Sequence, residues 1–321
     1  MNKKQLLIGM VTFLPGMSGA RKLNVFSTQS RKASNATSGR YGYSVWMRHL
    51  VLAAESGLNA DPRTVAELGP GASLGMGLAA VLSGVDRYYA FDVVAHANVE
   101  RNLRALDELI ELFQQRAEIP GESEFPRAKP QLRSWAFPSH ILTDARLQRT
   151  LVPERIARIR RSLADTRTAD SMIVYHVPWA DAAAVQPGTV DMVFSQAVLE
   201  HIDDLPTAYK AMYAWLRPGG VMSHQIDYKA HRTSRQWNGH WAMSDLTWRL
   251  VRGRRQYLLN RQPHSTHLRL IEGAGFKVCR QLPFYTKPAV PRERLARQYR
   301  QLSDDDLRTS GAFVQAVKFN Y

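Results

Sequence analysis

The segment VAELGPGASLG, residues 65–75, restricts the fold more than any other part of the sequence. Residues 64–68 form an apolar run typical of a strand, the Gly-Pro-Gly that follows breaks it, and residues 74–82 have the apolar spacing of a helix. A second apolar run, residues 88–91, ends in Asp92. Together these elements predict a βαβ unit of about 30 residues, the unit that builds parallel sheets covered by helices.

The alternation of strand and helix patterns continues on both sides of this unit. We therefore predict an α/β fold with a doubly wound, mostly parallel, seven-stranded sheet. The further strands are expected at residues 172–175, 191–195, 221–226, 276–280 and 312–319, and the further helices at 41–57, 99–115, 206–216 and 267–274.

Two stretches interrupt this rhythm. Residues 117–170 are rich in proline and end in a basic helical pattern, and residues 228–262 are rich in tryptophan, histidine and arginine. We predict that residues 41–321 form one domain with helical insertions at about these two places. Residues 1–40 are predicted to be an N-terminal segment with a flexible, small and polar lead-in.

The start of the chain has the pattern of a short signal peptide. Lys3 and Lys4 precede the apolar residues 6–14, and the small residues 18–20 follow. Arg21 and Lys22 come next, however, and positive charge at that place opposes export. We expect an uncleaved segment that packs on the domain or touches a membrane surface, with secretion as the alternative.

Composition narrows the classes of partner and cofactor. The single cysteine, Cys279, excludes an internal disulfide framework and a multi-cysteine metal site, and we predict no metal site. No apolar run approaches the roughly 20 residues that span a bilayer. A formal net charge of +15 over 321 residues favours an anionic partner: nucleic acid, phospholipid headgroups or a phosphorylated substrate.

The glycine turn indicates what the sheet binds. Its spacing, Gly69-x-Gly71-x-x-x-Gly75, differs from the G-x-G-x-x-G of dinucleotide folds. A carboxylate at the end of the first strand, Glu67, would repel a pyrophosphate but suits an ammonium group. Asp92, at the tip of the next strand, is placed to accept both hydroxyls of a ribose. The ligand that meets these conditions is S-adenosylmethionine.

The chain resembles the class I (Rossmann-like) S-adenosylmethionine-dependent methyltransferases in four segments that occur in the family's order. Besides the glycine turn, residues 191–201 (DMVFSQAVLEH) look like the family's fourth-strand motif, residues 217–221 like its turn into the fifth strand, and residues 273–276 like its turn into the sixth. The resemblance implies methyl transfer from S-adenosyl-L-methionine, bound in the cytoplasm.

The resemblance also implies cofactor contacts. Glu67, Gly69 and Gly71 would hold the methionine end, and Asp92 would hold the ribose. Ser73 stands where the family often has a third glycine, and its amide and hydroxyl can still line the turn. Further along the chain, Asp181 would lie near the adenine and Gln196 would face the methionine portion. Simple helix capping or a surface position is the alternative for the acidic residues.

Methyl transfer to a hydroxyl needs a group that removes its proton, near the carboxyl ends of the fourth and fifth strands. His201 follows the fourth strand, and His224 and Asp227 lie at the end of the fifth, with His231 four residues further. A histidine has a suitable intrinsic pKa, and Asp227 could orient it. A structural role is the alternative for each histidine, and some methyltransferases need no base.

The second insertion offers groups that suit an acceptor. Trp237 and His240 present aromatic rings, which suit sugars, and Arg261 suits a phosphate. Packing of a lid over the domain is the alternative for these residues.

The segments 41–50, 67–75 and 223–267 resemble methyltransferases of bacterial cell-surface polysaccharide synthesis. This second resemblance implies O-methylation of a sugar hydroxyl on a glycan or a lipid-linked precursor, with contact to the inner face of the membrane. An RNA methyltransferase and a non-catalytic binding protein are the rival functions, and nucleic acid is the less favoured partner because no RNA-binding module is present. The sequence does not give the oligomeric state.

Overall fold

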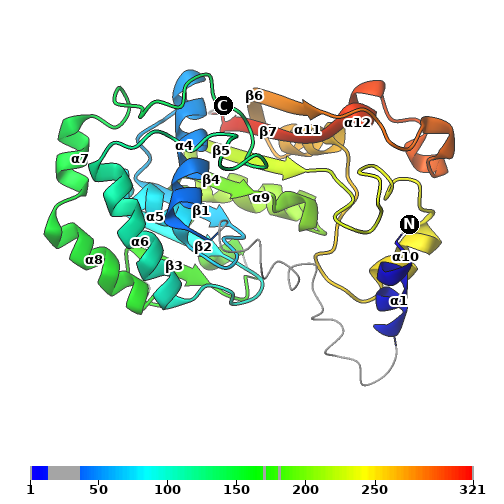
Figure 1. The fold of residues 1–321 in the computed structure, drawn as a ribbon, viewed down its shortest axis with the longest axis horizontal. Coiled ribbons are helices and arrows are strands. Elements are labelled where there is room, and N and C mark those ends of the chain that lie inside the picture. The colour runs from blue at the N-terminus through cyan, green and yellow to red at the C-terminus, as the bar shows by residue number, and fades with distance from the viewer. Residues whose placement is uncertain (1, 14–36, 169–170, 180–181, 320–321) are drawn as a thin grey trace.

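The computed structural model describes residues 2–13, 37–168, 171–179 and 182–319, and in this part of the chain one mixed sheet of seven strands forms the centre (Figure 1). The strand order is β3-β2-β1-β4-β5-β7-β6. The first five strands pair in parallel, and β7 is antiparallel to both of its neighbours. The predicted α/β fold class and seven-stranded sheet are confirmed. The strands are β1 (Thr64–Leu68), β2 (Arg87–Phe91), β3 (Ile173–His176), β4 (Val190–Gln196), β5 (Leu216–Asp227), β6 (Phe276–Tyr285) and β7 (Thr309–Lys318).

Helices cover both faces of the sheet, and each face has its own core. Because strand side chains alternate, Val65 and Met192 belong to one core while Ala66 and Val193 belong to the other. The first core is closed by α4 (Gly39–Glu55), α5 (Gly75–Leu82) and α6 (Val99–Gln114), and the second by α9 (Leu205–Trp215) and α11 (His264–Gly273).

The strands β5 and β6 differ most in length from the sequence prediction. The β6 strand continues past residue 280 to Tyr285 and includes Pro283. It lies at the edge of the sheet, where a proline is tolerated because its missing N–H is not needed by a second neighbour. The β5 strand begins earlier than expected, because Leu216 pairs with Val190 across an irregular register.

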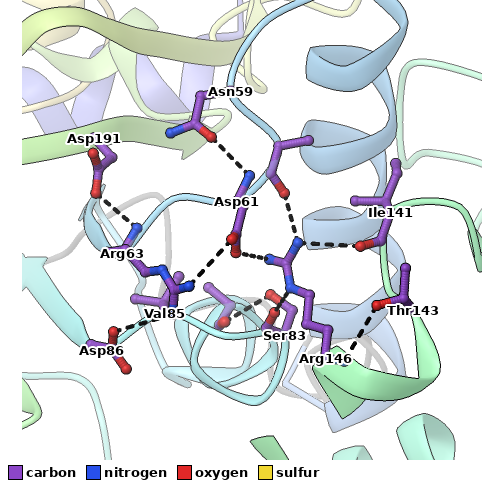
Figure 2. Close-up of polar contacts among 12 residues, drawn as sticks. Asn59, Asp61, Arg63, Ser83, Val85, Asp86, Ile141, Thr143, Arg146 and Asp191 are labelled. Atoms are coloured by element: carbon purple, nitrogen blue, oxygen red, sulfur yellow. Dashed lines mark hydrogen bonds and ion pairs between the residues drawn. The ribbon is translucent and has the colours of Figure 1, made fainter. Parts of the chain in front are cut away.

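The insertion at 117–170 packs on the α5–α6 side through α7 (Asp144–Thr150) and α8 (Pro153–Ala164). Arg146 of α7 is buried and binds backbone carbonyl groups of the parent domain (Figure 2). Its Nε donates to the carbonyl of Ser83 at 2.5 Å, and its Nη1 donates to that of Ala60 at 3.0 Å. Nη2 forms an ion pair of 3.0 Å with Asp61. This arginine therefore ties the insertion to the domain.

A second polar contact in Figure 2 fixes the start of the central strand. Oδ2 of Asp191, at the beginning of β4, accepts hydrogen bonds of 2.7 Å from the backbone N–H groups of Arg63 and Thr64. The carboxylate also pairs with Arg217. Asp191 thus holds together the amino-terminal ends of β1, β4 and β5. The glycine turn lies at the opposite, carboxyl-terminal ends of the strands.

The amino-terminal helix α1 (Lys3–Val11) packs on α10 (Asp245–Arg252), a helix of the second insertion (Figure 1). Gln5 Oε1 accepts a hydrogen bond of 2.6 Å from Arg255, and Thr12 Oγ1 accepts one of 2.8 Å from the backbone of Arg254. Residues 3–11 therefore pack on the domain, which is one of the two arrangements expected from the sequence.

The remaining elements are short. They are α12 (Asp304–Arg308) and the 3-10 helices η2 (Ala182–Ala184), η3 (Leu199–His201), η4 (Arg292–Arg294) and η5 (Arg297–Tyr299). Among the described residues, no helix is long and apolar enough to cross a membrane.

Candidate active site

The glycine turn follows β1 directly and depends on glycine at two positions. Gly69 and Gly71 adopt φ angles of +62° and +68°, which residues with a side chain rarely adopt. The Gly69 N–H donates to the carbonyl of Phe91 at 2.7 Å. A Cβ at position 69 would lie 2.7 Å from Cγ2 of Val198, which follows β4. The turn therefore sits tightly against the carboxyl ends of both neighbouring strands.

Asp92 lies beside this turn, as the sequence predicts. Its Oδ2 accepts a hydrogen bond of 3.0 Å from the Gly71 N–H, and its Oδ1 accepts one of 2.7 Å from the Val93 N–H. The backbone of Trp179, after β3, donates to the Asp92 carbonyl at 2.8 Å. The carboxylate is thereby fixed at the carboxyl edge of the sheet, which suits the predicted ribose contact.

Glu67 is fully buried under the turn rather than displayed on its surface. Its Oε2 accepts a hydrogen bond of 2.6 Å from the hydroxyl of Tyr88, and its Oε1 has no partner with full hydrogen-bond geometry among the described residues, although the backbone N–H of Gly77 lies near the carboxyl group. Burial raises the pKa of Glu67 to about 8. The carboxyl group is therefore largely neutral at pH 7 in this state, and an ammonium ligand would be needed to hold it ionised.

The sequence patterns do not indicate Tyr88 as the partner of Glu67. The residue in the sequence that could have indicated this contact is Gly77 on α5, because a Cβ at that position would lie 1.9 Å from Cζ of Tyr88. The glycine thus leaves room for the tyrosine ring to reach the carboxyl group.

The other predicted cofactor residues are placed as follows. Ser73 Oγ accepts a hydrogen bond of 3.2 Å from the Gly75 N–H at the start of α5, so the serine supports the turn. Gln196 is the half-buried last residue of β4 and pairs with Gln225. Asp181 lies outside the described residues.

His224 is a core residue of β5. It is fully buried, and its Nδ1 lies 2.7 Å from the hydroxyl oxygen of Ser195 on β4. Burial, together with the nearby His49, lowers its pKa to about 3. The ring is therefore neutral, and its position favours a structural role over contact with an acceptor.

The other two predicted catalytic residues, Asp227 and His201, lie together with two more ionisable groups. We call Glu200, His201, Asp227 and His231 the polar cluster. Nε2 of His231 lies 3.5 Å from Oδ2 of Asp227 and 3.8 Å from Oε1 of Glu200, and the His201 and His231 rings are 5.0 Å apart. Glu200 and His201 belong to η3, which begins directly after the residue that touches Gly69.

The environment sets different protonation preferences within the polar cluster. Burial raises the pKa of Glu200 to about 8. Burial also opposes ionisation of Asp227, but its contacts with His231 and Lys229 outweigh this effect and lower its pKa to about 2. For His231 burial favours the neutral form, yet the neighbouring Asp227 and Glu200 carboxyl groups raise its pKa overall. The contact between Asp227 and His231 therefore favours the charged form of each.

The polar cluster is held by the second insertion. Nδ1 of His201 lies 2.9 Å from the carbonyl oxygen of Leu258 and 3.0 Å from that of Tyr257. His231 has a φ of +38°, in the left-handed region that is unfavourable for a residue with a side chain. The sequence patterns point to His231 without a role for it, and they do not single out Glu200. The position of Glu200 directly before His201 is the one signal in the sequence that could have indicated it.

The predicted acceptor residues of the insertion have packing contacts. Trp237 donates from Nε1 to the Lys287 carbonyl at 2.9 Å. Burial, with a contribution from Arg261, lowers the pKa of the buried His240 to about 3. Arg261 is buried between Trp248 and Tyr299, with its Cζ 4.9 and 4.8 Å from the ring centroids. These contacts favour the lid-packing alternative for Arg261 in this state.

Residues 47–281 match a family model described as a methyltransferase domain. No curated protein matches the chain. Among solved structures, Haemonchus contortus phosphoethanolamine N-methyltransferase 2 in complex with S-adenosyl-L-methionine is 16% identical, with 92% of this chain and 59% of that chain covered and a TM-score of 0.43. An S-adenosylmethionine-dependent methyltransferase from Mesorhizobium loti is 14% identical, with 80% and 90% covered and a TM-score of 0.37.

The family match covers more than two thirds of the chain and includes the glycine turn, Asp92 and the polar cluster. The cofactor is S-adenosyl-L-methionine, and the turn, with its paired glycines and fixed carboxylate, suits this group. When bound, the cofactor supplies a methyl carbon attached to a positively charged sulfur. The chain belongs to the class I S-adenosylmethionine-dependent methyltransferases.

Proposed function

We propose that this methyltransferase acts on a hydroxyl group of a sugar, in a cell-surface glycan or its precursor. The observation that supports O-methylation is the polar cluster beside the glycine turn, at the carboxyl ends of β4 and β5. A sugar hydroxyl attacks the methyl carbon well only when its proton is removed, whereas a neutral amine needs no such help before attack. A buried group of two carboxyls and two imidazoles is suited to that task.

Asp227 and His231 are the two groups to which we assign the proton. Asp227 is ionised, and its Oδ2 faces Nε2 of His231 at 3.5 Å. A neutral His231 can accept the hydroxyl proton, and Asp227 then stabilises the imidazolium that results. Since Asp227 already raises the pKa of His231, the pair favours the protonated product of this step. His224, which the sequence also predicts, would act only by supporting β5.

The sugar acceptor is supported by composition and by the second insertion. The net charge of +15 suits a pyrophosphate-linked glycan, and the insertion places the half-buried Trp237 near the polar cluster, where its carbonyl oxygen accepts a hydrogen bond of 2.7 Å from the Ala230 N–H. The resemblance to polysaccharide methyltransferases points in the same direction.

The test is transfer of labelled methyl groups from S-adenosylmethionine to lipid-linked glycans, nucleotide sugars and total RNA. We expect alkali-stable label in a glycan or sugar. Asp227→Asn should lower turnover at least about 100-fold while cofactor affinity changes little, and the exposed Asp203→Asn is the matched control. Label confined to RNA would support the rival enzyme. Cofactor binding without transfer to any acceptor would support a non-catalytic binding protein.

We also propose that the protein works in the cytoplasm at the inner face of the membrane. The face formed by α1 and α10 exposes Leu7, Met10 and Phe13 from the first segment and Leu246 from the second, with exposed fractions of 40–68%. Exposed basic residues lie in the same two segments: Lys3, Lys4, Arg249 and Arg254. Apolar side chains flanked by positive charge suit an anionic lipid surface.

Vesicle flotation tests this contact. We expect the full chain to bind phosphatidylglycerol vesicles and not phosphatidylcholine vesicles. Leu7→Glu combined with Leu246→Glu should abolish binding, whereas Val152→Glu, an exposed position at the start of α8, should not. Equal binding by all three proteins would show that this face is not the contact.

A further inference from the structure

The carboxyl group of Glu200 is buried, and the contact between Asp227 and His231 does not provide it with a close partner. The residue is about 2% exposed, and neither carboxylate oxygen has a partner with full hydrogen-bond geometry in the described parts of the chain, although the backbone N–H groups of Glu200 and Asp227 lie near enough to favour the ionised form. Buried polar atoms nearly always have partners, because leaving water without replacement is costly. The carboxyl group would therefore gain from a proton or from a cation closer than the imidazole of His231, whose Nε2 lies 3.8 Å from Oε1.

The surrounding groups have the spacing of metal ligands. Glu200, His201 and His231 each offer one ligand atom, and these atoms all lie within 4.8 Å of one another. Ligands bound at about 2.0–2.2 Å from one cation are roughly 3.0–3.5 Å apart, or about 4.2 Å when they lie opposite each other. The separation of 3.8 Å between His231 Nε2 and Glu200 Oε1 is close to this range. The three ligand atoms are therefore close enough together to approach one cation.

The hydrogen-bond partners of His201 support a ligand role. A backbone carbonyl only accepts hydrogen bonds, so the contacts with Leu258 and Tyr257 place the ring proton on Nδ1 and the lone pair on Nε2. Metal-binding histidines are commonly oriented by a carbonyl in this way. The nitrogen of His231 nearest to Glu200 is likewise Nε2.

We propose that Glu200, His201 and His231 bind one divalent transition-metal cation, Zn²⁺ or Mn²⁺, at the acceptor side of the active site. Two imidazoles with a carboxylate select such a cation over Mg²⁺ or Ca²⁺, which prefer oxygen ligands. The site departs from the sequence-based prediction of no metal. The sequence does not reveal the metal site because its ligands come from η3 and from an insertion about thirty residues further along the chain.

The consequence for catalysis rests on the proposed O-methyl transfer. A hydroxyl bound to the cation loses its proton more readily, so a weak base is sufficient. Asp227, with Oδ2 3.5 Å from His231 Nε2, is placed to take that proton. The oxygen then forms a bond to the methyl carbon, the bond from that carbon to sulfur breaks, and S-adenosylhomocysteine leaves as a neutral thioether. In this form His231 is a ligand, and Asp227 alone receives the proton.

Calorimetry on the full chain, treated with EDTA and then freed of it, tests the site with ZnCl₂ and MnCl₂ as probes. We expect one cation per chain. Glu200→Gln and His231→Gln should each weaken binding at least 10-fold. The exposed Asp203→Asn and His140→Gln are the matched controls and should bind as the unaltered chain does. Circular dichroism and S-adenosylmethionine binding show that each variant is folded.

The possible outcomes separate this inference from the proposed function. Absence of saturable binding by the folded chain, or binding that Glu200→Gln leaves unchanged, overturns the metal site. If methyl groups then still reach a hydroxyl acceptor, O-methylation stands without a metal. If the cation binds as expected but label enters only nitrogen or carbon acceptors, the metal site stands and the proposed function fails.

Discussion

Replacement of Glu67 by glutamine should change how the stability of this protein depends on pH. The folded state raises the pKa of Glu67 from 4.5 to about 8, mainly through burial. Between these two values the folded chain holds a proton that the unfolded chain has released, so the free energy of unfolding falls as pH rises. The slope for one such group is about 1.4 kcal/mol per pH unit, and the total is on the order of 3–6 kcal/mol.

Glu67→Gln removes this term. The amide oxygen can still accept the Tyr88 hydroxyl, and the amide nitrogen takes the place of Oε1 near the Gly77 N–H, so any cost of the exchange is the same at every pH and leaves the pH dependence unaffected. We expect urea unfolding of the Glu67→Gln variant at pH 5, 6, 7 and 8 to show a weaker fall of the free energy of unfolding with pH. The fall should be smaller by about 1.4 kcal/mol per pH unit than in the unaltered chain. Glu111→Gln, on the exposed face of α6, controls for the loss of one carboxyl group. Equal slopes for both variants would refute the reasoning.

The same residue gives a functional measurement. If Glu67 holds the ammonium group of the cofactor, binding must ionise it, because only the carboxylate attracts a cation. At pH 7 the binding of S-adenosylmethionine should then release close to one proton, detected by calorimetry in buffers of different ionisation enthalpy. Glu67→Gln should release none from this position. Proton release that is the same in both proteins would place the ammonium elsewhere.

Three further predictions concern other positions. Asp92→Asn should weaken S-adenosylmethionine binding by about 1–3 kcal/mol in calorimetry, because the amide offers one acceptor oxygen where the carboxylate offers two. Unchanged affinity would remove Asp92 from the cofactor site. Arg146→Met should destabilise the fold by roughly 2–4 kcal/mol in urea unfolding, since it leaves buried carbonyl groups without a donor. The exposed Arg149→Met should cost little, and equal costs would contradict the anchoring role. His224→Ala should lower the thermal midpoint but retain turnover, whereas His231→Ala should lose turnover with the cofactor still bound. Loss of turnover in both would restore His224 as a catalytic candidate.

Local sequence patterns predicted the order and type of the elements well because the sheet is built from short units. Apolar runs with glycine breaks identified all seven strands, including β1 and β2. The bounds of β5 and β6 were less accurate. Pairing of Leu216 with Val190, and the tolerance of an edge strand for Pro283, depend on neighbours that are distant in the sequence.

Cofactor residues were easier to predict than acceptor residues because they belong to one short unit of the chain. Glu67, Gly69 and Asp92 belong to one βαβ unit, so their spacing along the chain nearly fixes their spacing in space. His224 and Arg261 have residue types that suit catalysis and phosphate binding, but the structure buries both. Residue type alone does not tell whether a side chain at the end of a strand points into the core or toward the acceptor.

The sequence by itself determined the fold class, the glycine turn and the cofactor, because these follow from hydrophobic periodicity and from groups close together in the chain. Only the tertiary structure decided which ionisable groups meet. Glu200 and His231 lie on separate segments, and they are brought within 3.8 Å of each other only when the second insertion folds against the end of β4. The charge and proton affinity of each group then depend on burial and on that neighbour, and neither is encoded by the residue alone.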